Sequence, residues 1–293
     1  MFRHVIVLAL AGLAAPALAA TPIDERRPLD ARGKVEVSNL KGSIEVRTWD
    51  RNEVHITGSL GEGVERLEIG DGGRILSVRV RYPRNSRDSE PTTLVLQIPQ
   101  QASLEAESVA AAIDVQGVAG DSLKLGSVSG RVTAVGAPGK ASAESVSGDL
   151  RLHINSREIS TESVSGNILL RGRIAGRVDI ETVSGDIEVD TRGERLARLQ
   201  SSTVSGDASV RAGIADDGRF SFESVSGDVR VMLPRDASAR VEAATFSGDI
   251  DAPGAEVVRK RYGPGASMKH DYGSGGGAIA IETFSGDVRL QLD

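Results

Sequence analysis

A short phrase, Ser or Thr, then Val or Phe, then Ser-Gly, recurs along the C-terminal two thirds of the 293-residue chain. Successive copies are 18, 18, 19, 21, 21, 21 and 38 residues apart, and a weaker copy ends at Ala112, 18 residues before the first. Repetition at such a period is typical of solenoids, in which each repeat forms one coil and stacks on its neighbours. The glycine of the phrase stands at positions 130, 148, 166, 185, 206, 227, 248 and 286.

Aligned on this glycine, the repeats are apolar at four shared offsets: seven and two residues before it, and two and four residues after it. Alternation with a period of two predicts strands that bury one face. We expect offsets −2, +2 and +4 to share the buried face, and −7 and −5 to share one as well. The step from −5 to −2 is odd, so the chain must bend near the Ser or Thr. The glycine then provides either a left-handed dihedral or a close backbone approach.

Each repeat has a constant block of twelve residues, from −7 to +4, and all length variation falls between blocks. Stacked coils require this, because neighbouring strands must pair in register while a loop can vary in length. The chain is therefore predicted to be all-β, a parallel β-solenoid with about 18–21 residues per coil. Eight coils at ~4.8 Å each give a rod of roughly 40 Å. Propeller repeats are usually about twice as long, and sandwich strands pair antiparallel, so both fit less well.

The first twenty residues have the features of a Sec-type signal peptide. Arg3 precedes an apolar run from Val5 to Leu13, and Ala17-Leu18-Ala19 supplies small residues for cleavage near Ala19/Ala20. We expect an exported protein in the periplasm or at the surface of a bacterium, with no transmembrane segment in the mature chain. The absence of cysteine argues against a lipid anchor and excludes disulfides.

The remaining chain is divided by its patterning. Residues 21–33 are expected to be a flexible tail, and residues 34–105 an N-terminal β-rich cap with the first irregular coils. Residues 106–293 are expected to form the regular solenoid, with a hairpin-like insertion at 253–278 that either binds a ligand or caps the last coil.

The recurring "SVSGD" and "TFSGD", the early "GSIEVRTWDRNEVHITG" and the late "GGGAIAIETFSGDVRL" resemble the bacterial "putative adhesin" domain family of β-strand repeat proteins. The resemblance covers about residues 34–293. It implies an exported or envelope-associated protein with a single-stranded, right-handed parallel β-helix, and some members of the family are associated with envelope-stress responses. It carries no catalytic residues that could be transferred to this chain.

The residues of the phrase itself favour a structural role. The Asp column after the glycine could hold calcium, but it lacks the glycine spacing of calcium-binding β-rolls, and Asp favours turns. Eight equivalent serines without a recurring histidine do not indicate a nucleophile. No catalytic, cofactor or metal residues are therefore predicted. The main enzyme alternative is a carbohydrate-active β-helix that uses the acidic run around Asp179, Glu181, Asp186 and Glu188.

The loops between blocks contain 16 Lys or Arg and 8 Asp or Glu, although the chain as a whole has a net charge of −6. Stacked coils would gather the loops along one edge, where basic side chains could meet an anionic envelope polymer or another envelope protein. The overall acidity argues against nucleic acid. The candidate binding surface comprises Arg171, Arg173, Arg177, Arg192, Arg195, Arg198, Arg259, Lys260, Arg261, Tyr262, Lys269 and Tyr272.

These features predict a non-enzymatic β-solenoid of the cell envelope that acts as an adhesin, a binding protein or a scaffold. The first alternative is a periplasmic protein that senses envelope stress through a partner. The second is the carbohydrate-active enzyme.

Overall fold

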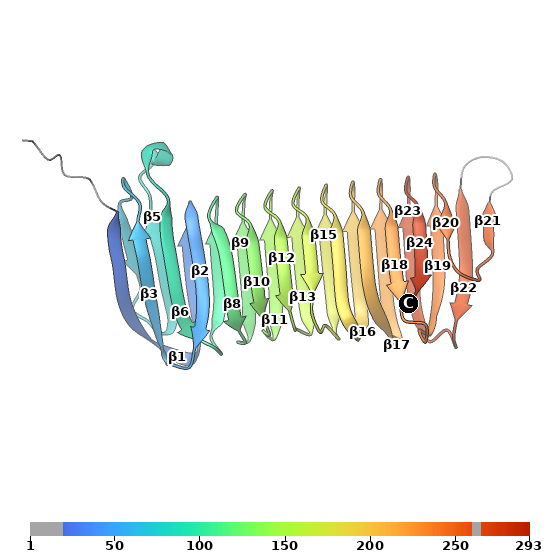
Figure 1. Ribbon diagram of the computed structural model, residues 1–293, viewed down its shortest axis with the longest axis horizontal. Coiled ribbons are helices and arrows are strands. Elements are labelled where there is room, and N and C mark those ends of the chain that lie inside the picture. Colours follow the sequence, from blue (N-terminus) through green and yellow to red (C-terminus); the bar gives the residue numbers. More distant parts are fainter. Residues whose placement is uncertain (1–19, 260–264) are drawn as a thin grey trace, which may run out of the picture.

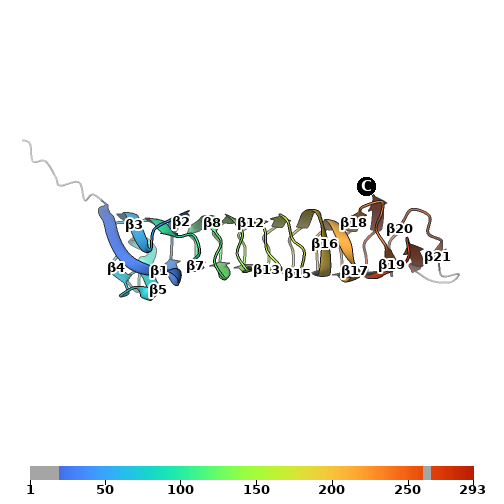
Figure 2. The ribbon, with the colours of Figure 1, turned by 90° about the horizontal axis from the view of Figure 1, so that it is seen from below.

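The computed structural model describes residues 20–259 and 265–293, and this part of the chain contains 24 strands, one 3-10 helix at Ser86–Asp88 and no α-helix. The strands lie side by side as the rungs of a long rod (Figure 1). Viewed at right angles, the rod has two layers (Figure 2). Apart from Ala20, the predicted signal peptide lies outside the described residues.

We call the layer that holds the strand before each corner glycine wall A. The strand β1 (Thr21–Asn39) contributes its second half, and β16 (Ile187–Thr203) and β17 (Ala208–Ser224) also contribute their second halves. The neighbours along wall A are, in order, β4 (Arg66–Ile69), β5 (Gly73–Arg81), β1, β7 (Ser103–Ser108), β9 (Ser122–Ser127), β11 (Lys140–Ser145), β13 (Glu158–Ser163), β15 (Arg177–Thr182), β16, β17, β23 (Gly277–Thr283), β19 (Ala239–Thr245), β22 (Ala266–Tyr272) and β21 (Val257–Arg259).

Wall B holds the strand after each glycine, together with the first halves of β16 and β17. At the N-terminal end of wall B, β3 (Glu53–Leu60) pairs on one side with β6 and on the other side with the first part of β1. The order along wall B is β3, β6 (Thr92–Pro99), β2 (Gly42–Trp49), β8 (Ala112–Val118), β10 (Val132–Gly136), β12 (Leu150–Ile154), β14 (Ile168–Arg171), β16, β17, β18 (Val229–Leu233), β24 (Val288–Leu292) and β20 (Ile250–Asp251).

Neighbouring coils pair in parallel and in the register that the repeat alignment predicts. Ala141, at offset −7, lies opposite Ile159, which has the same offset, and Leu150, at offset +2, lies opposite Ile168. The parallel, solenoid-like architecture predicted from the repeats is confirmed.

The core is a thin layer between the two walls. Offsets −7 and −5 of wall A and offsets +2 and +4 of wall B point inward, as Val178, Ile180, Ile187 and Val189 show, all 0–1% exposed. Because the rod holds one layer of side chains from each wall, no coil could bury its apolar residues without neighbours.

At the N-terminal end, the first coil does not occupy the outermost place. The coil of β1 and β2 lies between the coil of β5 and β6 on one side and that of β7 and β8 on the other. Residues 21–33, expected to be a flexible tail, instead belong to β1. Thr21–Pro28 pair antiparallel with β3, and Leu29 is 1% exposed. The pairing of these residues covers the open edge that a solenoid end would otherwise expose.

The C-terminal end repeats this arrangement. The last coil, β23 and β24, lies between the coil of β17 and β18 and the coil of β19 and β20. The chain thus passes the place of the last coil, turns back through β21 and β22, and returns to fill it (Figure 1). The antiparallel partner of β19 on its outer side is β22. Consecutive repeats are neighbours in space from β7 onward, except at this step.

Candidate functional site

Each coil turns from wall A to wall B through the same corner. In four consecutive coils, the hydroxyl at offset −3 accepts a hydrogen bond from the glycine N–H three residues on, as between Ser163 and Gly166 at 2.8 Å. The glycine is required by close approach rather than by its dihedral, because a Cβ on Gly166 would lie 2.1 Å from the carbonyl oxygen of Gly148. The motif glycines are absent from the positive-φ positions of the described residues. The second of the two roles predicted for the glycine is therefore the observed one.

The Val or Phe at offset −2 points to solvent, and the prediction that it is buried was wrong. The bend occurs between −3 and −2, so −3 occupies the inward position and −2 the outer side of the corner. These side chains are 44–56% exposed and follow one another along the rod. Near the C-terminal end, the rings of Phe284 and Phe246 stack with centroids 4.8 Å apart. We call this row the apolar ridge, and it consists of Val109, Val128, Val146, Val164, Val183, Val204, Val225, Phe284 and Phe246.

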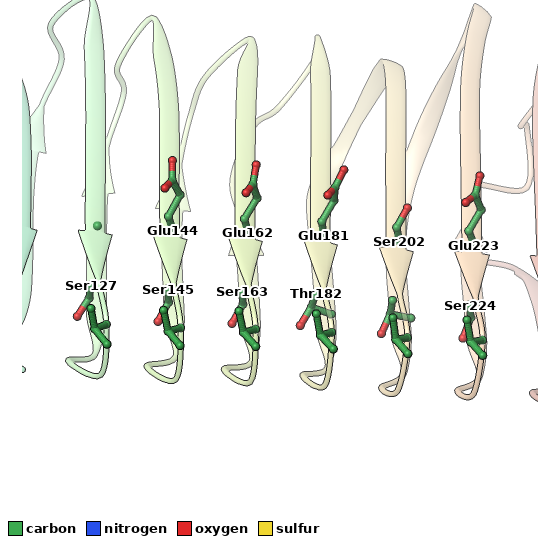
Figure 3. Close-up of a pocket in the computed structure, with 18 of the residues that line it drawn as sticks. Ser127, Glu144, Ser145, Glu162, Ser163, Glu181, Thr182, Ser202, Glu223 and Ser224 are labelled. Carbon is green, nitrogen blue, oxygen red and sulfur yellow. The ribbon is translucent and has the colours of Figure 1, made fainter. Parts of the chain in front are cut away.

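A second row runs beside it on wall A, at offset −4. Its carboxylates are exposed, and Figure 3 shows Glu144, Glu162, Glu181 and Glu223 pointing in one direction from their strands. Ser202 takes the place of a glutamate in the coil between Glu181 and Glu223. We call this row the acidic row, and it consists of Glu107, Glu144, Glu162, Glu181, Glu223 and Glu282.

The acidic row has no ion-pair partner among the described residues, although most neighbouring acids do. Glu105, two residues before Glu107 on the same outward face of β7, is bound by Lys34 at 2.6 Å and by Lys124 at 3.2 Å. The pKa of Lys124 is raised, mainly by its hydrogen bond to Glu105. The negative charges of Glu144 and Glu107 raise it by smaller amounts. Carboxylates on adjacent strands are ~4.8 Å apart and repel one another unless a cation lies between them.

Between the apolar ridge and the acidic row lies an open groove of about 1030 Å³ that extends along eight coils, from Glu107 to Phe284. Its floor is the strand at offset −3, whose hydroxyl side chains point inward at the corner (Figure 3). One of them, Thr203, is 5% exposed and its hydroxyl has no hydrogen-bond partner. The groove extends across eight coils, which suits an elongated ligand more than a compact one.

The sequence contained a signal for this groove. Glutamate recurs at −4 and Val or Phe at −2, an interval of two residues, which places both on one side of a strand. The alternation predicts that the −2 column lies in the core, and this prediction does not bring the two columns together on the surface.

The predicted basic residues lie largely at the opposite edge, and several are neutralised. Arg171 bonds to Glu188 at 2.5 Å, and Arg177 to Asp179 at 2.5 Å, and these bonds raise the pKa of each guanidinium. Arg195 contacts Asp216 and Asp236. Arg198 lies in register between Arg177 and Arg219 on adjacent strands. The predicted binding surface included Arg177 and Arg198 but omitted Arg219.

Arg173 and Arg192 also lie on this edge. The backbone N–H of Arg173 donates to Asn155, and Arg192 has a left-handed φ of 52°. Interleaved acids weaken this edge as an anion-binding surface.

The predicted residues of the insertion fall into three groups. Lys260, Arg261 and Tyr262 lie outside the described residues. Arg259 and Lys269 are exposed and paired, with Asp249 at 2.7 Å and Glu242 at 2.5 Å. Tyr272 was placed on a binding surface, but it is 7% exposed, and its hydroxyl donates to the Pro253 carbonyl at 2.8 Å. Burial raises the pKa of Tyr272, which belongs to the packing of the rod end.

The acidic run considered for an enzyme is divided between the walls. Asp179 and Glu181 lie on β15 in wall A, whereas Glu188 lies on β16 in wall B and binds Arg171. Asp186, at the corner, accepts a hydrogen bond from the Asp207 N–H at 3.0 Å. Glu188 therefore lies on a different wall from Asp179 and Glu181.

The Asp column forms a ladder along the rod. Each side chain accepts a hydrogen bond from the backbone N–H of the equivalent residue in the next coil, at 2.8–3.3 Å. The ladder follows the spatial order of the coils, from Asp228 to Asp287 and then to Asp249. The structural role that we favoured for this column is the observed one.

No group of three or more His, Asp or Glu side chains within residues 20–259 and 265–293 is placed to hold a metal ion. The same residues contain no helix that could cross a membrane.

Residues 32–291 match the family model described as Toastrack DUF4097. The chain belongs to this family. The resemblance to a family of β-strand repeat proteins that the sequence predicts is therefore confirmed.

Among solved structures, the Toastrack chain resembles a protein from Parabacteroides distasonis described as a "putative lipid binding protein", with 13% identity and a TM-score of 0.54 over 92% of this chain and 96% of that one. This likeness supports the fold. A "putative adhesin" from Parabacteroides merdae has 13% identity and a TM-score of 0.46 over 92% and 96% of the two chains. A "putative adhesin" from Bacteroides fragilis has 8% identity and a TM-score of 0.45 over 93% and 98%. No curated protein matches the sequence.

Proposed function

We propose that this Toastrack protein is a non-catalytic binding protein of the bacterial cell envelope, and that the groove holds an elongated ligand. One observation carries the proposal: the apolar ridge and the unpaired acidic row run in parallel along eight coils. Exposed apolar side chains in a continuous row favour a partner that covers them. A charged row without internal partners adds an attraction that the fold itself does not use.

The comparisons support this proposal in a coarse form. Structural neighbours are described as a "putative lipid binding protein" and as "putative adhesins", which are binding roles. Export through the signal peptide of residues 1–20, cleaved near Ala19/Ala20, is part of the proposal. We place the protein in the periplasm or at the cell surface.

The groove favours a partner other than the anionic polymer first considered. An anionic chain would be repelled by the acidic row, and the basic edge is largely paired. Of the two partners predicted from the sequence, another envelope protein is therefore the one we propose.

The test compares two triple variants of the purified mature protein for binding to isolated envelopes of the producing bacterium. V164S/V183S/V204S removes three side chains of the apolar ridge. I75S/V135S/V258S removes three other apolar side chains that are 43–61% exposed and lie outside the groove. Circular dichroism and the thermal midpoint establish that both variants are folded.

Loss of about 1 kcal/mol of apolar contact at each ridge position would weaken binding at least tenfold, whereas the control triple should bind as the wild type does. Equal binding by the two triples, or no binding by the wild type, would reject the proposal.

A further inference from the structure

We propose that the ligand of the groove is an extended polypeptide segment, contributed by another envelope protein, in which basic and apolar side chains alternate. This inference rests on the proposed function and specifies the partner of the same groove.

The two sides of the groove differ in chemistry. The apolar ridge at −2 forms one side and the acidic row at −4 forms the other, with the strand between them as the floor (Figure 3). In an extended chain, successive side chains point to opposite sides. A segment lying along the rod would therefore direct one set of alternate residues to the carboxylates and the other set to the valines. A basic residue followed by an apolar one, repeated, satisfies both sides.

The length of the groove sets the length of the segment. Eight coils from Glu107 to Phe284 are separated by seven intervals of ~4.8 Å, which gives about 34 Å. An extended chain advances ~3.3 Å per residue, so a segment of about ten residues fills the groove. Five basic side chains of such a segment would face six carboxylates, and the flexible lysine side chain can absorb the small difference in spacing.

The acidic row presents carboxylates that are available to a ligand. Glu144, Glu162 and Glu181 lie on adjacent strands, β11, β13 and β15, and the described residues supply no ion-pair partner to any of them. Elsewhere on the same wall, carboxylates are paired, as Asp179 is with Arg177 and Glu242 with Lys269. A cationic ligand therefore binds here without having to displace an arginine or lysine of this chain.

The surroundings of the groove disfavour a second copy as the occupant. The corner with its apolar ridge lies between the acidic row at −4 and the Asp ladder at +1, where Asp186, Asp207 and Asp228 are exposed. Docking this edge against the same edge of another copy would bring carboxylates together, at a cost in affinity. The same rows would repel an anionic membrane surface.

The groove runs along the rod axis, across the strands. A peptide in it cannot add to the sheet as another strand, because the backbone groups of wall A are already used between coils. Recognition then depends on side chains, which is why we specify the alternation and not a strand-forming sequence.

The probe is a fluorescein-labelled decapeptide of five Lys-Val repeats, titrated with the full mature protein and followed by fluorescence anisotropy. Three control peptides change one feature each: five Glu-Val repeats reverse the charge, five Lys-Ser repeats remove the apolar residues, and five lysines followed by five valines remove the alternation. We expect the Lys-Val repeat to bind most tightly and the Glu-Val repeat not to bind.

Two variants with the same change of charge separate the groove from general attraction to an acidic protein. E144Q/E162Q/E181Q neutralises three adjacent members of the acidic row. D71N/D217N/E256Q neutralises three exposed acids outside the groove. Each exposed ion pair contributes only modestly to binding, so the loss of three should weaken Lys-Val binding about tenfold in the groove triple, whereas the control triple should weaken it less than twofold.

Equal weakening by the two triples, or equal binding of the alternating and block peptides, would overturn the inference. So would absence of Lys-Val binding. If envelope binding were still lost in V164S/V183S/V204S, the proposed function would stand and only the partner would be wrong. If envelopes bound independently of the apolar ridge, the proposed function would fail as well.

Discussion

The corner glycine offers the sharpest test of how the coils are stacked, through the substitution Gly166→Ala. A Cβ at this position would lie 2.1 Å from the Gly148 oxygen and 2.7 Å from its carbonyl carbon, where ordinary contact begins at 3.4 Å. The two coils would have to separate locally by more than an ångström. Three hydrogen bonds meet at this corner: Gly166 N–H to Ser163, Asn167 N–H to Asp149, and Ser165 N–H to Val146.

Because a hydrogen bond contributes ~0.5–1.5 kcal/mol net, losing these three should lower the free energy of unfolding by about 2–4 kcal/mol. The control is Gly126→Ala, in the wall A strand β9, where the added Cβ would meet only the Glu107 Cγ at 3.9 Å. There the loss of glycine's freedom in the unfolded chain should leave stability unchanged or raise it by about 0.5 kcal/mol. Urea unfolding followed by circular dichroism measures both. A cost below 1 kcal/mol for Gly166→Ala, or an equal cost for Gly126→Ala, would refute the close-approach explanation.

Three further predictions concern the rest of the rod. Deleting residues 149–166 removes one complete coil and rejoins equivalent corners, so hydrogen exchange should remain slow throughout. Deleting residues 277–293 should make exchange fast in β19, which loses β23 as a neighbour, and in β22, which is joined to the rod through β19. Thr161→Val should raise the free energy of unfolding by about 1 kcal/mol, because the Thr161 hydroxyl is buried without a hydrogen-bond partner. Thr182→Val should lower the free energy of unfolding by a similar amount, because the Thr182 hydroxyl accepts a hydrogen bond from the Gly185 N–H. Hydrogen bonds from Lys34 and Lys124 lower the pKa of Glu105 below 4.5, so the contribution of Glu105 to stability is present above that pH and is lost as the pH falls through the lowered pKa. Glu105→Gln should therefore flatten the pH dependence of the urea midpoint below pH 4.5. An unchanged profile would contradict this.

The register of the rod could be predicted because each coil repeats the same apolar offsets. Once Ile159 and Val178 occupy equivalent positions, parallel pairing of like residues follows, and it is observed. The handedness implied by the resemblance stays a prediction.

The exposed position of the −2 column could not be predicted from period alone. A valine suits the inside of a strand and the outside of a tight corner equally, and the alternation did not show on which side of the bend it falls. Only the buried hydroxyl at −3, as at Ser163, determines that Val164 faces outward.

The order of the coils at the two ends was not accessible for a different reason. Every coil presents the same edges, so the sequence does not say that Phe220 pairs with Ile279 and not with Val241. The spacing of 38 residues before Gly286 was interpreted as a long loop, although it also reflects the return of the chain to an inner place.

Cysteine labelling can show whether the outward side of the repeated corner is the ligand-binding surface, because the chain contains no cysteine of its own. Val164→Cys places a thiol on the ridge, Val135→Cys places one at an exposed site outside the groove, and Ile168→Cys places one in the core. The reaction rate of each with a maleimide is measured with and without isolated envelopes. We expect fast labelling at 164 and 135, slow labelling at 168, and protection by envelopes at 164 alone. Slow labelling at 164 in the free protein, or equal protection at 164 and 135, would contradict it.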